Sequence, residues 1–200
     1  IEMVVFGITG GSGSGKTSVS KMLEKLGVHI IDTDVIAHEI VEPNSDCLNE
    51  LVDYFGDSIL NDDKTLNRKK LASIAFSDKQ KTEALSNITH KYIKAEVVKD
   101  INTTDAELVG IDGAVIIGSN VEPLCEFIVS VIADKQSRIT RIKTRDNITD
   151  EQAIQRINAQ NDDEFYKENS MYIIYNNGDI AQLESDVVGL FNKIKGNSFE

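Results

Sequence analysis

The residues Gly10-Gly11-Ser12-Gly13-Ser14-Gly15-Lys16-Thr17 decide the fold of this chain. They fit the pattern G-x-x-x-x-G-K-[ST] without a mismatch, which is the signature of a phosphate-binding loop, or P-loop. Glycines let successive backbone N–H groups turn toward phosphate oxygens, where a Cβ would obstruct them, and the helix that follows presents its positive end to the same anion. In such loops the lysine reaches the β- and γ-phosphates and the threonine hydroxyl is a Mg²⁺ ligand. We therefore expect a Mg²⁺–nucleoside triphosphate to be held by Gly11, Ser12, Gly13, Ser14, Gly15, Lys16, Thr17 and Ser18.

The segments around the loop have the structure that the motif requires. Met3 to Thr9 is an apolar run rich in β-branched residues, and Val28 to Ile31 is a second such run; both predict buried strands. Between them, residues 17–26 carry apolar side chains at helical spacing. Strands that alternate with helices predict a parallel sheet covered by helices, so the expected class is an α/β fold with a P-loop NTPase core.

The rest of the chain divides by its hydrophobic pattern. Helical segments are expected near 35–41, 46–55, 67–76 and 79–101, and strands over 108–111, 127–133 and 172–175. Residues 135–169 are strongly charged and helical in pattern, and a closing helix is expected over 179–195. These patterns predict core segments 1–35, 107–135 and 169–200, a helical insertion over 36–106 and a helical lid over 136–168.

Composition excludes several classes of function. The 200 residues include 21 Lys and Arg against 33 Asp and Glu, a net charge of −12, which disfavours binding to nucleic acid or to an anionic membrane. No apolar run is long enough to span a membrane, and the apolar start is too short for a signal peptide. The two cysteines, Cys47 and Cys125, are far apart and have no metal-ligand spacing. We expect a cytoplasmic protein that binds phosphates at a local site, without nucleic-acid or membrane partners.

Carboxylates follow two of the predicted strands. Asp32 and Asp34 come directly after the second strand, at the sheet edge where ligands bind in open α/β folds. One could accept a proton from an attacking hydroxyl while the other orients metal-bound water; alternatively, one of them only caps the helix that begins near Val35. Asp112 ends the third core strand, where it would act on Mg²⁺ through water or serve as a turn residue before Gly113.

Arg138, Arg141 and Arg145 lie at positions i, i+3 and i+7, along one face of a predicted helix. A row of guanidinium groups in an acidic protein predicts a lid that closes over phosphates. The alternative is a solvated face that pairs with neighbouring acids. Arg156 and Gln160, one turn apart on the next helix, indicate the lid more weakly. His90, taken alone, is typical of a packing histidine on the long helix.

The class of phosphate-binding protein follows by elimination. The chain has no N-K-x-D element to recognise guanine, and 200 residues are too few for a large motor or transporter ATPase. A small-molecule kinase remains, with two alternatives. One is a kinase of another small acceptor such as a nucleoside, and the other is a nucleotide-binding module without turnover.

Over nearly its whole length the chain resembles dephospho-coenzyme A kinase. The strings that carry the resemblance agree in order and spacing and are residues 7–17, 30–37, 41–43, 55–56, 66–68, 88–90, 136–146, 156–160 and 174–178. The resemblance implies transfer of the ATP γ-phosphate to the 3′-hydroxyl of dephospho-coenzyme A, with ATP and Mg²⁺ as cofactors, in a protein expected to be a monomer. It also implies that 36–106 binds the acceptor.

Residue roles carry over with the resemblance. Asp34 matches the catalytic base, Lys16 the P-loop lysine and Arg145 a lid arginine at the phosphates, while Arg138, Arg141 and Asn176 are expected at the nucleotide. The acceptor or its metal is expected to be bound or supported by Asp32, Asn67, Arg68, His90 and Asp112. The sequence departs from the family at Ser12, Lys91, Gly118 and Met171, where Ile, Pro, Glu and Asp are usual.

Overall fold

Five strands form one sheet in the order β2-β3-β1-β4-β5. In the computed structural model, which describes residues 3–196, the strands are β1 (Val4–Thr9), β2 (His29–Asp32), β3 (Leu108–Asp112), β4 (Phe127–Ile132) and β5 (Tyr172–Tyr175). β1 pairs in parallel with both β3 and β4, and β4 pairs in parallel with β5. Residues 1–2 and 197–200 of the expected core segments lie outside the described residues. The predicted α/β class is confirmed.

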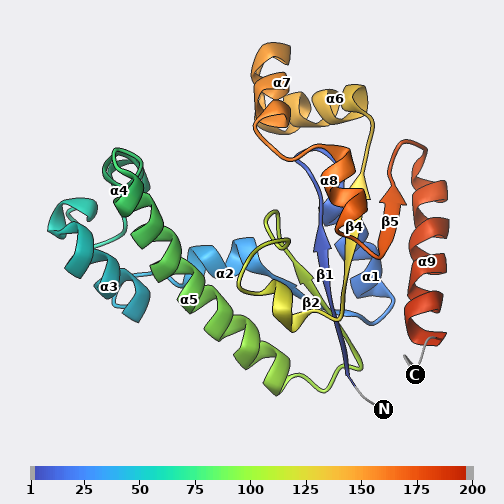
Figure 1. The fold of residues 1–200 in the computed structure, drawn as a ribbon, viewed down its shortest axis with the longest axis horizontal. Coiled ribbons are helices and arrows are strands. Elements are labelled where there is room, and N and C mark those ends of the chain that lie inside the picture. The colour runs from blue at the N-terminus through green and yellow to red at the C-terminus, as the bar shows by residue number, and fades with distance from the viewer. Residues whose placement is uncertain (1–2, 197–200) are drawn as a thin grey trace. The chain divides into compact units, whose positions relative to one another are not determined.

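Helices α1 (Lys16–Lys25) and α9 (Ile180–Gly196) pack against the sheet and against each other. α9 lies beside β5 (Figure 1). The shared core takes Val19 and Leu23 from α1, Val187 and Leu190 from α9, and alternate residues of the strands. β3 and β4 are buried along their whole length, which is why their sequences are continuous apolar runs rather than alternating patterns.

Residues 32–103 form a separate compact unit made almost entirely of helices. Its elements are α2 (Thr33–Glu39), α3 (Asp46–Phe55), the 3₁₀ helix η1 (Asp57–Ile59), α4 (Arg68–Ala75) and α5 (Lys79–Thr103). α5 contacts α2, α3 and α4, so this long helix is the support on which the unit is assembled. The other unit comprises residues 1–31 and 104–200 and contains the P-loop.

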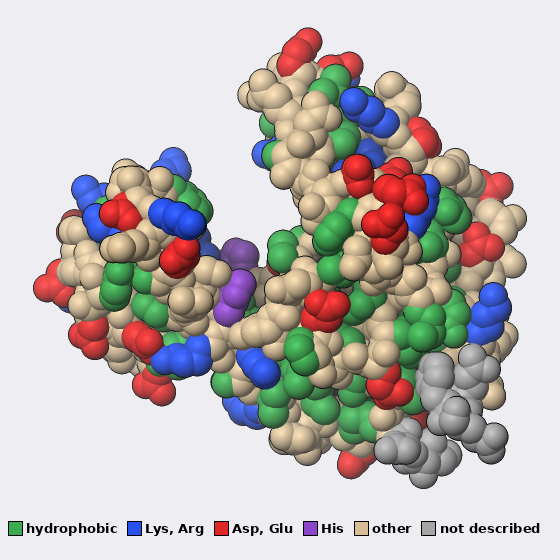
Figure 2. All heavy atoms as spheres, viewed as in Figure 1, with side chains coloured by type: hydrophobic (Ala, Val, Ile, Leu, Met, Phe, Trp, Pro, Cys, Tyr) green, Lys and Arg blue, Asp and Glu red, His purple; other side chains and the backbone are tan. Residues whose placement is uncertain are grey.

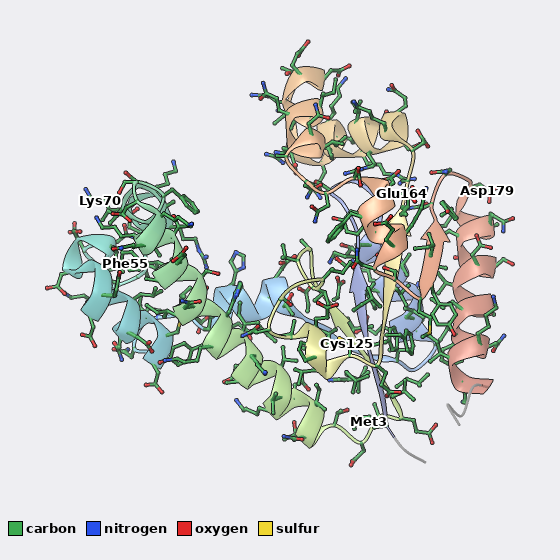
Figure 3. All side chains as sticks on the ribbon, in the orientation of Figure 1. Met3, Phe55, Lys70, Cys125, Glu164 and Asp179 are labelled. Atoms are coloured by element: carbon green, nitrogen blue, oxygen red, sulfur yellow. The ribbon has the colours of Figure 1, made fainter. Side chains whose placement is uncertain are left out.

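Three helices follow β4 in the unit that carries the P-loop: α6 (Lys135–Asp146), α7 (Asp150–Asn158) and α8 (Asp163–Glu168). α6 and α7 share a small core of Ile139, Ile142, Ala153 and Ile157. Each helix has a side-chain cap at its start, from Asp134, Thr149 and Asp162. Acidic side chains gather over the beginning of α8 (Figure 2), where Glu164 lies (Figure 3). A 3₁₀ helix, η2 (Glu122–Leu124), precedes β4.

None of the helices within residues 3–196 combines the length and the apolar character that crossing a membrane requires.

Candidate active site

The P-loop connects β1 to α1 and leaves several backbone donors without a partner. Gly13 and Gly15 have φ of 77° and 95°, a left-handed conformation that glycine adopts without steric cost. Gly15 is also the N-cap of α1, and it provides no side-chain acceptor. Within residues 3–196 the N–H groups of Gly13, Gly15, Lys16 and Thr17 donate to no acceptor, so they are available to an anion at the start of the helix.

The carbonyl groups of the same loop are held from behind by side chains that are distant in sequence. Arg138 Nε donates to Ser12 O over 2.9 Å, and Arg141 Nη1 donates to Gly13 O and Ser14 O over 3.2 Å each. The Asn176 amide, which follows β5, donates to Ser14 O over 2.8 Å. Because the carbonyl groups are bound on the outer side, the loop keeps its N–H groups on the inner side.

This arrangement requires glycine at two positions of the motif for a second reason, besides access of the phosphate to the backbone. A Cβ at Gly15 would lie 2.0 Å from Asn176 Nδ2, and one at Gly11 would lie 2.4 Å from Arg138 Nη2. The space that a side chain would fill is therefore taken by Arg138 and Asn176. Together with Arg141 they hold the loop carbonyl groups, and we call these three residues the clamp. Asn176 in turn accepts from Arg141 Nη2, at its backbone oxygen over 2.9 Å and at Oδ1 over 3.3 Å.

Lys16 and Asp112 form an ion pair beneath the loop. Asp112 ends β3 opposite Ile8 of β1, and its side chain is only 4% exposed. A buried carboxylate requires a compensating charge, and the P-loop lysine provides it. The structure thus pairs Asp112 with the lysine of the P-loop, so it is not only a turn residue before Gly113.

Asp32 and Asp34 differ in their local roles within the unit of residues 32–103. Asp32 is the N-cap of α2, and its Oδ1 accepts the N–H groups of Asp34 (2.8 Å) and Val35 (3.1 Å). Asp34 is exposed, and its carboxylate makes no hydrogen bond or ion pair with another residue of that unit. The capping role that the sequence left open thus belongs to Asp32, and the Asp34 carboxylate is left for other chemistry.

The arginine row on α6 is divided between two environments. Arg138 and Arg141 face the P-loop, whereas the Arg145 side chain is 60% exposed and binds Asp146 through Nε (2.7 Å) and Nη2 (2.8 Å). Arg156 on α7 pairs with the same carboxylate. Hydrogen bonding from Arg145, with the charges of both arginines, lowers the pKa of Asp146 to about 2. Arg145 therefore pairs with a neighbouring acid on the solvated face of α6, whereas Arg138 and Arg141 point toward the P-loop.

The expected acceptor residues Asn67, Arg68 and His90 all lie in the helical unit. Asn67 caps α4, where its Oδ1 accepts the Lys70 N–H over 2.9 Å, and Arg68 is the exposed first residue of that helix. His90 lies on α5, with Nδ1 3.4 Å from Ser86 Oγ.

The departure at Lys91 is compensated within the helical unit. Lys91 forms an ion pair with Glu50, whose carboxylate also accepts from Tyr92 Oη over 2.6 Å. These bonds lower the pKa of Glu50, with the Lys91 bond as the larger cause.

Gly118 and Met171 lie outside the helical unit. Gly118 adopts a φ of 78°, which suits glycine, and its N–H donates to Glu122 Oε2 over 2.6 Å. Met171 is 58% exposed, and nothing in the structure explains its presence.

Two contacts of the P-loop were not predicted from the residues themselves. Asn176 was expected at the nucleotide through family resemblance alone, and its hold on Ser14 O is a contact across 162 positions. Gln160 Oε1 accepts the Ser12 N–H over 2.7 Å, and the sequence indicated only a general lid position for it. Periodicity cannot identify either partner, because it describes one helix at a time.

A family model and curated relatives identify the family of the chain. The family model described as dephospho-CoA kinase matches residues 4–182. A dephospho-CoA kinase of Lactobacillus johnsonii is 34% identical over 191 residues, which cover 94% of this chain and 96% of that protein.

Solved structures agree with this comparison. The dephospho-CoA kinase from Campylobacter jejuni is 26% identical with a TM-score of 0.69, and the match covers 96% of this chain and 98% of that one. A Thermus thermophilus protein has the same fold, with 24% identity, a TM-score of 0.84 and coverage of 97% and 99%.

Proposed function

The chain belongs to the dephospho-CoA kinase family, and from this premise we propose how its residues carry out the reaction. The enzyme uses ATP to phosphorylate dephospho-CoA, a step of coenzyme A biosynthesis. The acceptor atom is the 3′-hydroxyl of the ribose, so the γ-phosphorus–oxygen bond to ADP breaks as the bond to that hydroxyl oxygen forms, and the hydroxyl proton is lost.

The observation that carries the proposal is the clamped P-loop. Its unpaired N–H groups at the start of α1 bind the β- and γ-phosphates, and Lys16 leaves Asp112 to follow the transferred charge. Arg138, Arg141 and Asn176 act on the nucleotide indirectly, by holding the loop carbonyl groups away from the anion. Gly11, Ser12, Ser14 and Ser18 complete the loop and the first turn.

Asp34 is the base that accepts the proton of the acceptor hydroxyl. Asp32 already satisfies the first N–H groups of α2, so the Asp34 carboxylate is not consumed by capping. Phosphoryl transfer has a loose transition state in most analyses, and a correctly oriented carboxylate is therefore sufficient without a strong base.

The residues at the loop fit a Mg²⁺ ion bound together with ATP. Thr17 is exposed in the first turn of α1, where its hydroxyl is a hard oxygen donor, and the buried Asp112 carboxylate lies beneath the loop beside Lys16. Mg²⁺ keeps several waters and takes few protein ligands, so it needs no cluster of three acidic residues, and residues 3–196 contain none. The ion supplies neutralisation of phosphate charge; Thr17 would bind it directly, and Asp32 and Asp112 through water.

Arg145 releases Asp146 and then stabilises the transferred phosphoryl group. The acceptor is bound by the helical unit through Asn67, Arg68 and His90, which assigns 36–106 to the acceptor and 136–168 to the lid. The protein works as a cytoplasmic monomer without nucleic-acid or membrane partners. The net charge of −12 supports the absence of nucleic-acid and membrane partners, because it repels polyanions that need an extended surface.

The test is to incubate the purified protein with ATP, Mg²⁺ and dephospho-CoA and to measure ADP and coenzyme A. We expect acceptor-dependent ADP in equal amount to coenzyme A; ADP release that no acceptor stimulates would refute the function. Asp34→Asn should reduce kcat by at least about 100-fold, the lower range for a general base, with ATP affinity nearly unchanged. Asp53→Asn is the matched control, since Asp53 is an exposed carboxylate of α3 with no assigned role in the reaction.

A further inference from the structure

The backbone of Ser12 is bound at both its N–H and its carbonyl group by residues from the α6–α8 segment. Gln160 Oε1 accepts the Ser12 N–H over 2.7 Å, and Arg138 Nε donates to the Ser12 carbonyl over 2.9 Å. Arg138 Nη2 also donates to Gln160 Oε1 over 3.2 Å. The three residues therefore form a closed ring of hydrogen bonds that holds the two peptide groups on either side of the Ser12 Cα.

The orientation of the Gln160 amide follows from its partners. Both groups that approach it, a backbone N–H and a guanidinium, are donors only, so the atom between them must be the oxygen. The Gln160 NH₂ group makes no hydrogen bond to any residue of 3–196 and points away from the two donors. One carboxamide oxygen thus joins the P-loop to α6, while its own backbone belongs to the connection between α7 and α8 (Figure 1).

Gln160 lies between two cavities as well as in the connection between α7 and α8. Gln160 and Asn161 line two separate cavities, one of about 620 Å³ toward Lys135 and Glu164, and one of about 220 Å³ toward Thr9 and Val115. The residue thus lies at the wall between them, beside the end of β1. Arg138 is 5% exposed and lies 3.7 Å from Asp163 at the start of α8, which ties the same connection to α6.

We propose that Gln160 is a positioning residue for phosphoryl transfer, a role that rests on the proposed kinase function. Its oxygen fixes the Gly11–Ser12 peptide group through the Ser12 N–H and fastens the α7–α8 connection to the P-loop. The connection then closes the loop side of the site against water while the acceptor hydroxyl attacks. Gln160 acts through Ser12 and Arg138 and is not itself a ligand that supplies ground-state affinity for ATP.

The chain offers variants that separate this role from packing. Gln160→Met keeps the length and volume of the side chain but removes the acceptor, and Gln160→Glu keeps an acceptor oxygen at the same reach. Gln160→Asn keeps the amide but is one methylene too short. Gln155→Met is the matched control, because Gln155 is an exposed residue of α7 whose side chain makes no hydrogen bond within 3–196.

The measurements are kcat with ATP and dephospho-CoA, Kd for ATP, and ATP hydrolysis without acceptor. Losing the acceptor that Ser12 shares with the charged Arg138 should lower kcat about 10- to 100-fold in Gln160→Met and Gln160→Asn, the range for a hydrogen bond to a charged group. Kd for ATP should change less than about threefold, and hydrolysis should rise relative to transfer as the lid admits water. Gln160→Glu should recover most of the transfer-to-hydrolysis ratio.

Each other result decides against the proposal. If Gln160→Met behaves like Gln155→Met, Gln160 has no positioning role; if Kd rises in proportion to the fall in kcat, it is a ground-state ligand instead. A wild-type-like Gln160→Asn would show that the reach of the oxygen is irrelevant. Failure of the wild-type enzyme to form coenzyme A would refute the kinase function separately, before any variant is compared.

Discussion

Replacing Arg141 with alanine removes the most connected side chain of the P-loop clamp. Its Nη1 donates to Gly13 O and Ser14 O, and its Nη2 donates to the backbone and side-chain oxygens of Asn176. The variant leaves Gly13 O without this donor and frees the Asn176 amide from one of its two partners. The loop should therefore lose rigidity as well as stability.

The size of the effect follows from the number of donor groups involved. A hydrogen bond to a charged group contributes about 1.5 to 3 kcal/mol, and partial exposure of Arg141 places each of its two amino groups at the lower end. The expected loss is about 3 kcal/mol of unfolding free energy. For a domain of 150 to 250 residues this corresponds to a fall in Tm of about 6 to 12 °C.

Arg145→Ala is the internal control for this prediction. Arg145 lies one turn further along α6, but its side chain is 60% exposed and binds only Asp146, an ion pair of the kind that contributes about 0 to 1 kcal/mol. Thermal unfolding without nucleotide should therefore show a much larger fall in Tm for Arg141→Ala than for Arg145→Ala. Equal shifts, or a larger one for Arg145→Ala, would refute the clamp.

Three further predictions test other parts of the structure. The pKa of Asp146 is about 2 in the folded protein against an ordinary 3.8, so its arginine pairs stabilise the fold above pH 4 and lose that effect as pH falls toward 2. Asp146→Asn should thus unfold more easily than wild type at pH 6, with most of the difference lost at pH 2 in thermal melts; an undiminished difference there would contradict the assignment. Burial raises the pKa of the Cys47 thiol to about 11 and of Cys125 to about 12, so neither should react with a thiol reagent at pH 8 until urea unfolds the chain. Gly15→Ala puts a Cβ 2.0 Å from Asn176 Nδ2 at a φ of 95°, which should cost at least about 1 to 2 kcal/mol in urea denaturation and abolish binding of a fluorescent ATP analogue; normal binding would show that the loop tolerates the strain.

The strands and helices were predictable because each depends on local chemistry. β5 occupies the expected residues 172–175, and α3 begins and ends where the pattern indicated, at Asp46 and Phe55. Continuous apolar runs predict strands buried on both faces, and here those strands, β3 and β4, lie on either side of the central β1. The nucleotide loop was equally predictable, since its glycine spacing is a local requirement.

The division of labour within the site was not predictable from spacing. Helical periodicity places three arginines on one face of α6 but does not show that two of them meet the P-loop while Arg145 meets its neighbour Asp146. Likewise the sequence left either Asp32 or Asp34 as the cap. The choice depends on where α2 begins, and it begins at Thr33, two residues before the expected start near Val35. A shift of this size is within the ordinary uncertainty of helix ends.

The clamp on the P-loop also has a consequence for the order in which the protein can mature. The nucleotide-binding motif at 10–17 is synthesised more than a hundred residues before the side chains that shape it, which come from positions 138, 141, 160 and 176. A nascent chain that stops short of Asn176 carries the glycines without the groups that turn their N–H bonds inward. ATP can then stabilise the fold only after residue 176 has been made, and not as an early template for the P-loop.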